Sequence, residues 1–376
     1  MGHAVTDPLS GSAPLRAAAC EIRPAPADGA WAGTRPFTVT ALDEVSPAVR
    51  AVRLEPCDGG PLPDHRPGQH VTVRAGSPDG SPQDAAGARS YSLTGPAVEP
   101  GRTGYRFAVR HVPGGSFSTL VHERLRVGDR LHLGTPSGVF AVPTHTDRPV
   151  VLLAGGIGVT PFLGYLETLA HTGGTVPEVV LHHGNANSAD HPFRERLREL
   201  AARIPALRVI DHYTDPAGQD LAGRDHFRTG RITAADIDAA LIERRARFYL
   251  CGPEPMLRSL TEGLGERGVP RFEIFSEKFR AAPREVDLPD GAAFTVRFAR
   301  SGREATWRKG DGTLLALGEA AGVPMPSGCR VGQCESCART VLEGRANHLV
   351  TPSEDLPDTD VLTCQSVPAC DLVLDA

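Results

Sequence analysis

The chain has 376 residues, of which 40% are hydrophobic and 23% charged, and its formal net charge is −5. At about 100–200 residues per domain, this length predicts two to three domains with buried cores. The acidic excess, without a long basic run, argues against a nucleic-acid-binding protein. No segment approaches the roughly 18 apolar residues of a membrane span, and the N-terminal residues do not form a secretory signal, so we expect a soluble, cytoplasmic protein.

The sequence changes character near residue 35. Residues 1–34 are rich in Ala, Gly and Pro without periodicity, which predicts a flexible tail. Residues 35–145 contain short alternating segments separated by turn residues, for example at 37–41, 70–73 and 105–109. Closely spaced strands of this kind predict an antiparallel β-barrel, interrupted by one helix near 117–125.

A second pattern begins at residue 146. Apolar strands are expected at 149–154, 179–182, 207–212 and 247–250, and helices at 193–202 and 232–242. Strands that alternate with helices predict an α/β domain with a parallel sheet over residues 146–280. Residues 281–290 are expected to form a linker, and residues 291–376 a compact third domain.

The third domain holds most of the cysteines. Five of the eight cysteines of the chain lie after residue 328. Cys329, Cys334 and Cys337 follow a C-x4-C-x2-C spacing and Cys364 lies further on, which is the plant-type pattern for a 2Fe-2S cluster. A zinc site and four unrelated thiols are the alternatives, but zinc knuckles usually present two C-x2-C pairs and this segment has one. We therefore predict that these four cysteines bind a 2Fe-2S cluster, because soft thiolates suit iron and sulfide.

Further motifs lie in the first two domains. The barrel contains Arg89-Ser90-Tyr91-Ser92 and, ahead of its helix, Gly114-Gly115-Ser116-Phe117-Ser118. The α/β domain contains Ala154-Gly155-Gly156-Ile157-Gly158-Val159-Thr160-Pro161 after its first strand and Tyr249-Leu250-Cys251-Gly252-Pro253 at the end of a later one. With the cysteines, these motifs make residues 35–376 resemble the ferredoxin–NADP reductase superfamily. The domain order resembles that of phenylacetyl-CoA oxygenase, ketosteroid hydroxylase and phthalate dioxygenase reductases, which implies a β-grasp fold for the 2Fe-2S ferredoxin-like domain.

The resemblance implies a flavin site in the barrel. Arg89 can grip a phosphate with its fork of donors, Tyr91 can lie against the isoalloxazine or ribityl chain, and Ser92 can hydrogen-bond near the reactive N5. Glycines before a helix expose N–H groups to a pyrophosphate, so FAD is favoured, with FMN left as the alternative. A Tyr/Ser alternation on an ordinary strand is the structural alternative. The expected flavin-binding residues also include Ser90, Val109, Arg110, His111, Gly115, Ser116, Phe117 and Ser118.

The resemblance also implies a nicotinamide site. The glycine turn lies between a strand and a helix, where a dinucleotide pyrophosphate approaches the helix start. Cys251 is expected beside the nicotinamide and flavin rings, and with Ser92 it is the predicted catalytic pair; a buried strand-end cysteine is the alternative. Phe279, in Glu277-Lys278-Phe279, is expected close to the flavin or else in the core. The other nicotinamide-binding candidates are Gly155, Gly156, Gly158, Thr160, Pro161, Gly252 and Pro253.

The segment after the second α/β strand bears on the choice of nucleotide. It reads His183-Gly184-Asn185-Ala186-Asn187-Ser188, and the first arginine after it is Arg194. Relatives selective for NADPH place an arginine in this segment to grip the 2′-phosphate, and without that guanidinium the phosphate lacks its ion pair. The sequence therefore favours NADH, with NADPH left as the alternative.

These features together predict an NAD(P)H-dependent electron-transfer oxidoreductase. A hydride carries two electrons and the cluster accepts one, so a flavin must convert between them before the cluster reduces a separate oxygenase or hydroxylase. One alternative is a diaphorase that reduces small acceptors directly. Another, of a different class, is a redox-sensing or binding module with a vestigial flavin site. The barrel and nicotinamide motifs also resemble the reductase half of flavohaemoglobins, but we expect no nitric oxide dioxygenation by this chain alone.

Overall fold

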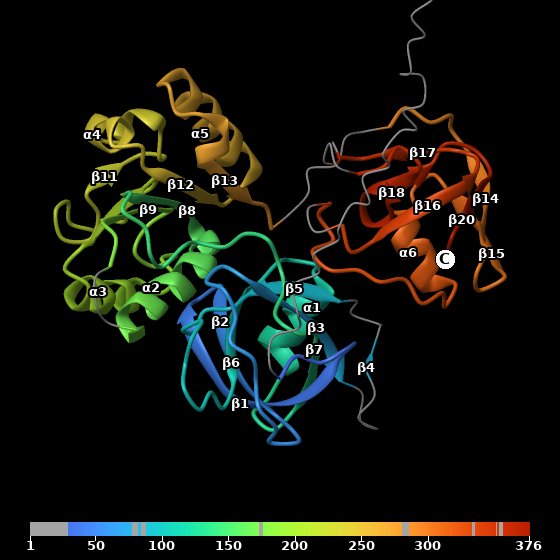
Figure 1. Cartoon of the computed structure of the whole chain (residues 1–376), viewed down its shortest axis with the longest axis horizontal. Coiled ribbons are helices and arrows are strands. Elements are labelled where there is room, and N and C mark those ends of the chain that lie inside the picture. Colours follow the sequence, from blue (N-terminus) through green and yellow to red (C-terminus); the bar gives the residue numbers. More distant parts are fainter. Residues whose placement is uncertain are drawn as a thin grey trace, which may run out of the picture.

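The computed structural model contains three units (Figure 1). It describes residues 29–76, 82–83, 88–172, 176–279, 286–332, 335–350, 352 and 356–376. Most of the predicted tail, part of the predicted linker and Cys334 lie outside these residues. In the view of Figure 1 the barrel lies below, the α/β unit to the upper left and the C-terminal unit to the right.

The first unit is the expected antiparallel barrel. Its strands are β1 (Arg35–Ser46), β2 (Val49–Pro56), β3 (His70–Gly76), β4 (Pro82–Gln83), β5 (Arg89–Ser92), β6 (Tyr105–Arg110) and β7 (Arg130–Leu133). They pair in the order β4-β3-β7-β1-β2-β6, and β5 pairs with β3. A bridge between Leu93 and Phe107 joins the end of β5 to β6, which closes the barrel around a buried apolar core.

The helix expected near 117–125 is also present in the barrel unit. It begins as α1 (Ser116–Thr119) and continues as a π-helical turn over Leu120–Arg124. Phe117 and Val121 point into the barrel core, with 2% and 0% of their surface exposed.

The structure differs from the sequence analysis at the end of the predicted tail. The Trp31 indole N–H donates a hydrogen bond to the Leu133 carbonyl oxygen at 2.9 Å, and its ring lies 5.7 Å from that of Phe37. The Arg35 guanidinium lies over the same indole ring at 5.4 Å. One aromatic side chain in an Ala/Gly/Pro-rich segment thus packs on the barrel, which the prediction of a flexible tail did not include, although most of residues 29–34 are exposed.

The second unit has the expected parallel sheet. Its elements are β8 (Val150–Gly155), α2 (Thr160–Thr172), β9 (Val179–Asn185), α3 (Arg194–Arg203), β10 (Leu207–Tyr213), β11 (Arg228–Thr229), α4 (Ala239–Glu243), β12 (Arg247–Cys251), α5 (Glu254–Glu266) and β13 (Ile274–Glu277). All neighbours in the order β11-β10-β9-β8-β12-β13 are parallel.

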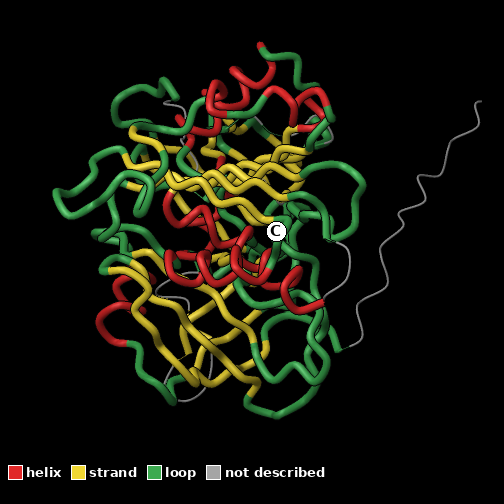
Figure 2. Tube along the Cα trace, turned by 90° about the vertical axis from the view of Figure 1, so that its left-hand side faces the viewer, coloured by secondary structure: helices red, strands yellow, loops and turns green. Residues whose placement is uncertain are grey.

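Helices cover both faces of this sheet (Figure 2). Leu152 of β8 packs in a core with residues of α2 and α3, whereas Leu153 packs in a second core with residues of α4 and α5. A strand buried on both faces explains why residues 149–154 form a continuous apolar run rather than an alternating one.

The helix predicted at 232–242 is interrupted. A 3₁₀ turn spans Ala234–Asp236, and its capping box is made by Thr233 and Asp236. The backbone of Ile237 is extended, and the Asp238 carboxylate accepts a hydrogen bond from the Ala240 N–H at the start of α4. Two consecutive N-terminal caps divide the segment, because each stops one turn and begins the next.

The C-terminal unit is a mixed sheet with one helix. Its elements are β14 (Ala293–Phe298), β15 (Arg303–Arg308), α6 (Leu314–Ala320), β16 (Ala338–Glu343), β17 (Ala346–His348), β18 (Asp360–Leu362), β19 (Ser366–Pro368) and β20 (Leu372–Leu374). The main sheet has the order β15-β14-β20-β16-β18, with β14 and β20 parallel. Leu314, Leu315 and Leu317 of α6 pack against it, as a ferredoxin-like unit requires.

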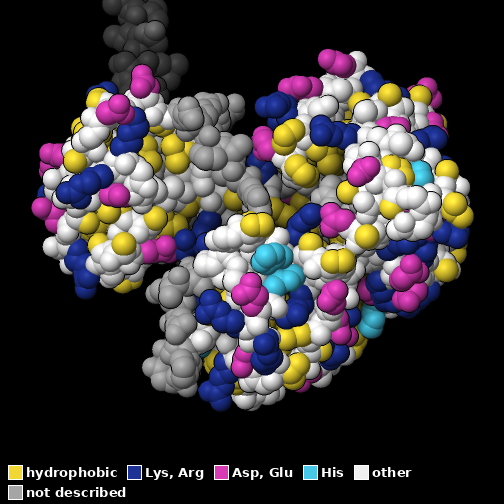
Figure 3. All heavy atoms as spheres, turned by 180° about the vertical axis from the view of Figure 1, so that it is seen from behind, with side chains coloured by type: hydrophobic (Ala, Val, Ile, Leu, Met, Phe, Trp, Pro, Cys, Tyr) yellow, Lys and Arg dark blue, Asp and Glu magenta, His cyan; other side chains and the backbone are white. Residues whose placement is uncertain are grey.

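Basic and acidic side chains are interspersed over the face seen in Figure 3. Neighbouring charges of opposite sign therefore offset one another, and the described residues on this face form no large region of one charge. Within the described part of the chain, every helix is too short or too polar to cross a bilayer.

Candidate functional site

Strand β5 carries the predicted flavin motif on the barrel wall. The Tyr91 ring stacks on Phe107 at a centroid distance of 5.1 Å and lies 5.5 Å from Phe117. Burial raises the pKa of the Tyr91 phenol above its usual range, so the ring stays neutral. The Ser90 hydroxyl is buried without a hydrogen-bond partner among the described residues. The strand therefore offers a ligand an aromatic ring to pack against and a hydroxyl group to hydrogen-bond.

Gly114 and Gly115 form the turn before α1. Gly114 has a φ of +74°, and a side chain there would meet open space. The Ser118 hydroxyl accepts a hydrogen bond from the Val112 N–H at 3.1 Å and lies 3.1 Å from the Gly115 carbonyl oxygen. Ser118 and the Gly115 N–H, which donates to the Val112 carbonyl oxygen at 2.9 Å, thus hold the turn together, and Phe117 anchors it in the core. Of the two glycines, Gly114 is the one next to open space.

The end of β6 joins the barrel to the α/β unit. Val109 is buried, and its carbonyl oxygen accepts a hydrogen bond from His122 Nε2 at 2.9 Å. The Arg110 guanidinium pairs with the Asp190 carboxylate at 3.1 Å, and the His111 N–H donates to the Ala48 carbonyl oxygen at 2.7 Å. Arg110 therefore bridges two units in this structure.

The glycine turn after β8 packs tightly against the Cys251-Gly252-Pro253 segment. A Cβ on Gly158 would lie 2.2 Å from the Cys251 carbonyl oxygen, and one on Gly155 would lie 2.7 Å from Pro253 Cδ. The Thr160 hydroxyl donates to the Ile157 carbonyl oxygen at 3.0 Å, and Pro161 is in the first turn of α2. These glycines are required for the close approach of the two backbones.

Three strand ends bring Ser92, Cys251 and Glu277 together. Cys251 pairs with Glu277 across β12 and β13, and His70 pairs with Ser92 across β3 and β5. His70 Nδ1 lies 3.9 Å from Glu277 Oε1, which places the two pairs side by side. Barrel and α/β unit thus meet at this cluster.

Burial favours the uncharged forms of Glu277 and Cys251 in this cluster. Burial raises the pKa of Glu277 to about 8, although the neighbouring Ser92 hydroxyl offsets part of this shift. Burial also raises the pKa of the Cys251 thiol well above its usual range, and the Glu277 charge adds to the effect. The sequence analysis named Glu277 only as part of a motif and passed over His70. The strand register could have identified both residues, because Glu277 pairs with Cys251 and His70 pairs with Ser92.

Phe279 follows β13 and is 37% exposed, so it does not belong to the buried core. In the same segment the Phe275 ring stacks on Tyr249 at 4.8 Å.

Three of the four predicted cluster ligands lie close together, and Cys334 lies outside the described residues. A hydrogen bond with Cys337 raises the pKa of the Cys364 thiol; burial and the nearby charges of Cys337 and Cys329 raise it further. The Val331 N–H lies 3.4 Å from Cys329 Sγ and donates to it. Crowded thiols that raise one another's pKa fit a cation-bearing cluster, because bound iron favours the thiolates.

The cysteine loop is held from two sides. Arg330 has a φ of +58° and pairs with Glu319 of α6 at 3.1 Å, while its carbonyl oxygen accepts from Gln365 Nε2 at 2.8 Å. Burial lowers the pKa of the Arg89 guanidinium, and the positive charge of Arg330 lowers it further. Arg330 of the cysteine loop therefore lies near enough to Arg89 of β5 for their charges to interact.

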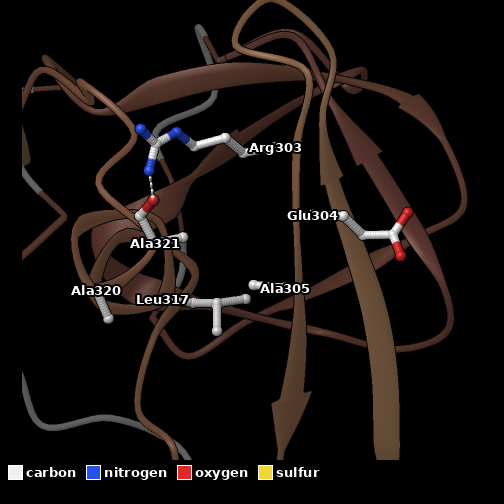
Figure 4. Close-up of a pocket in the computed structure, with 6 residues that line it drawn as sticks. All are labelled: Arg303, Glu304, Ala305, Leu317, Ala320 and Ala321. Atoms are coloured by element: carbon white, nitrogen blue, oxygen red, sulfur yellow. Dashed lines mark hydrogen bonds between the residues drawn. The ribbon is translucent and has the colours of Figure 1, made fainter.

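A separate pocket of about 450 Å³ lies between β15 and α6 (Figure 4). The Arg303 guanidinium over it already donates to the Ala321 carbonyl oxygen, and Glu304 points away. The remaining lining residues are Ala305, Leu317 and Ala320, which offer no donor set for a cofactor.

Comparisons with known proteins agree with this architecture. Residues 152–262 match the oxidoreductase NAD-binding domain family, and residues 296–369 match the 2Fe-2S iron-sulfur cluster binding domain family. The flavohemoprotein of Rhizobium meliloti (strain 1021) is 33% identical over 256 residues, which are 67% of this chain and 62% of that protein. The chain thus spans less than two thirds of the length of the curated relatives it matches.

Two solved structures extend the likeness into the C-terminal unit. Phthalate dioxygenase reductase, described as a modular structure for electron transfer from pyridine nucleotides to [2Fe-2S], superposes with a TM-score of 0.65 at 24% identity, covering 92% of this chain and 98% of that one. An intact type IV self-sufficient cytochrome P450 monooxygenase superposes with a TM-score of 0.61 at 25% identity, covering 91% of this chain and 41% of that one. The expected fold class of three units is confirmed.

Proposed function

Because the chain belongs to the flavin- and NAD-binding reductases that carry a C-terminal 2Fe-2S ferredoxin domain, we propose that it passes electrons from NADH to a separate oxygenase or hydroxylase. The observation that carries this proposal is the meeting of Ser92, Cys251 and Glu277 at three strand ends, together with the charge interaction between Arg89 of β5 and Arg330 of the cysteine loop. A diaphorase needs only the first of these two features, the cluster around Ser92. The second supports transfer onward from flavin to cluster.

The residues around Ser92 prepare a site for hydride transfer. A bound flavin supplies the exchange between a two-electron hydride and single electrons. Cys251 and Glu277 are both neutral at about pH 7, so no fixed negative charge is placed beside the reacting rings. Ser92 orients the flavin edge by a hydrogen bond, and Tyr91 gives it an aromatic surface. The proposed role of these groups is to hold two rings in contact and exclude water.

The turn at Gly114 and Gly115 supports FAD rather than FMN. Its open backbone can meet a pyrophosphate, and FMN has none. We expect acid extraction followed by chromatography to release FAD. Release of FMN alone would assign this turn a structural role.

The surroundings of the second α/β strand support NADH. The Ser188 N–H donates to the Asp220 carboxylate at 3.2 Å, so an acidic group lies where a 2′-phosphate would need a cation. Arg194, the first arginine after this strand, is paired with Asp225. A carboxylate and an already paired guanidinium both disfavour NADPH.

An anaerobic titration of the holoprotein tests the pathway and the nucleotide together. We expect NADH, at micromolar concentration, to bleach the flavin band and then the cluster band, with a reduced-cluster EPR signal. NADPH should require far higher concentrations. Bleached flavin with an oxidised cluster would favour the diaphorase, and protein that held iron but no flavin would favour the sensing module.

The acceptor is proposed from the compared proteins, which include phthalate dioxygenase reductase and a P450 monooxygenase. Adding purified oxygenase components of both kinds to NADH and the holoprotein should give NADH-dependent product with one class. A cytoplasmic location is part of the proposal, because Cys57, Cys251 and Cys370 form no disulfide in the described part of the chain.

A further inference from the structure

We propose that His183, His191 and Asp211 form a site for a divalent transition-metal ion, with Zn²⁺ the best fit, beneath the nucleotide-binding turn. One ligand atom from each residue lies within 4.8 Å of the other two. The three side chains are only 0%, 3% and 7% exposed, so the group is enclosed by protein. It is separate from the cysteines, and its existence does not depend on the proposed reductase activity.

The parallel sheet builds this group. His183 on β9 pairs directly with Asp211 on β10, so their side chains are neighbours on one face. His191 comes from the loop between β9 and α3; its ring lies 4.7 Å from that of His183, and its Nε2 lies 3.6 Å from Asp211 Oδ1. In a tetrahedral zinc site with bonds near 2.0–2.1 Å, ligand atoms lie about 3.3 Å apart. The separation of His191 from Asp211 is already close to this value, whereas the wider separations, of up to 4.8 Å, must contract when the ion binds.

Outer hydrogen bonds leave lone pairs facing the centre of the group. His183 Nε2 lies 2.9 Å from the Gly156 carbonyl oxygen, which can only accept, so Nε2 carries the proton and Nδ1 is left with a lone pair. His191 Nδ1 lies 2.9 Å from the Tyr213 hydroxyl, and in the tautomer whose Nδ1–H donates to that oxygen, Nε2 carries a lone pair. His183 Nδ1, His191 Nε2 and Asp211 Oδ1 are all buried without a hydrogen-bond partner in the described part of the chain.

This arrangement is the one that metal-binding histidines adopt. A ligating imidazole usually donates its other N–H to a carbonyl or a similar group, which fixes the tautomer. Two imidazoles and a carboxylate suit zinc among the common divalent ions. Asn185, two residues after His183 on the same face of β9, also has both amide atoms buried without a partner in the described part of the chain.

A second histidine pair in the same strands has its facing ring nitrogens hydrogen-bonded to each other. His182 and His212 lie on the opposite face of the sheet and bond each other, with Nδ1 of one 3.0 Å from Nε2 of the other. They share burial and strand position with the proposed ligands but leave no such three-atom group. His212 is therefore a matched control position.

The site would act on the nucleotide turn. His183 holds the carbonyl of Gly156, which has a φ of +52° within the glycine motif. An ion that fixes His183 also fixes this turn, so we expect bound Zn²⁺ to lower the KM for NADH with little change in kcat. This consequence, unlike the site itself, rests on the proposed function.

The test measures metal directly on the holoprotein. Protein with its 2Fe-2S cluster is incubated with Zn²⁺ and desalted, and zinc and iron are counted by mass spectrometry. We expect about one zinc per chain with iron retained, and a zinc X-ray absorption spectrum with nitrogen and oxygen ligands near 2.0–2.1 Å. Sulfur ligands near 2.3 Å, or no zinc above background, would overturn the proposal.

Variants assign the site. Asp211→Asn keeps the size of the side chain but removes the anionic ligand, and His191→Gln removes an imidazole; each should weaken zinc binding by about 10-fold or more. His212→Gln should bind zinc like the parent. Flavin and iron contents report folding in every variant. Equal zinc affinity in Asp211→Asn, His191→Gln and His212→Gln would also refute the assignment.

Discussion

At the scale of single residues, Glu277 has the most unusual environment near the flavin motif. Its carboxyl group is buried at the end of β13, and burial raises its pKa from the ordinary 4.5 to about 8. Between these values the folded chain holds a proton that the unfolded chain releases. The stability that Glu277 contributes is therefore fully present below about pH 4.5 and is lost as the pH rises through about 8.

Replacing Glu277 with Gln should remove this pH dependence. The neutral amide keeps the shape of the side chain and needs no proton. We expect the melting temperature of Glu277→Gln, relative to the parent, to increase between about pH 5.5 and about pH 8.5. Flavin fluorescence during heating at a fixed rate measures it. A difference that does not change with pH would show that Glu277 is ionised in the folded protein.

Cys251 is the second residue whose role can be tested alone. Its thiol is fully buried and neutral beside Glu277, and Cys57, which is exposed, provides a matched control. We expect Cys251→Ala to lower the rate of flavin reduction by NADH about 10-fold or more, because misplaced reacting rings lose much of the gain from orientation. Cys57→Ala should leave the rate unchanged. If flavin reduction by NADH were as fast in both variants as in the parent, Cys251 would serve only to pack the core.

At the scale of secondary-structure elements, most of the fold could be predicted because its signals are local. The apolar run of β8, the alternation in β1 and the glycine turn before α2 each follow from short stretches of sequence. The segment around Asp238 was misread because helical periodicity does not reveal that a side chain caps a new helix. Trp31 was misread because its partner, Leu133, lies far away in the sequence.

The glycine turn itself gives a prediction at this scale. A Cβ at Gly158 would meet the Cys251 carbonyl oxygen at 2.2 Å, so one of the two backbones must move. We expect Gly158→Ala to destabilise the protein by about 1–3 kcal/mol and to raise the KM for NADH. Thermal unfolding and steady-state kinetics measure the two effects.

Gly265 is the control for Gly158. It lies in α5, and a Cβ there would meet nothing within 4 Å. Gly265→Ala should stabilise the protein by up to about 1 kcal/mol, because alanine favours a helix over glycine. If Gly158→Ala melted like Gly265→Ala, close packing of the turn would not explain this glycine.

At the scale of the whole molecule, the sequence predicted which cofactor residues are present but not how they meet. The charge interaction between Arg89 and Arg330 depends on how the C-terminal unit lies against the barrel, and no local pattern records that. The same holds for Glu277 beside Ser92 and for the group of His183, His191 and Asp211, which need the strand register. Sites whose residues come from different units or strands cannot be assembled from local sequence patterns alone.

Separate units also predict separable activities. Cys364 is buried next to Cys337, and Cys364→Ser removes one soft ligand from the predicted cluster set. We expect this variant to lose the cluster but to keep flavin and NADH-dependent ferricyanide reduction. Reduction of a one-electron protein acceptor such as cytochrome c should fall sharply. Unchanged iron content would remove Cys364 from the ligand set.

In the proposed pathway, electrons enter at the cluster of Ser92 and Cys251 and leave through the cysteine loop. Rapid anaerobic mixing of the holoprotein with NADH, followed by absorbance and by freeze-quenched EPR, tests this order directly. The account predicts that the flavin band bleaches first and that the reduced-cluster EPR signal grows only afterwards, within a single turnover. A cluster signal that never appears, or that appears without prior flavin reduction, would contradict it.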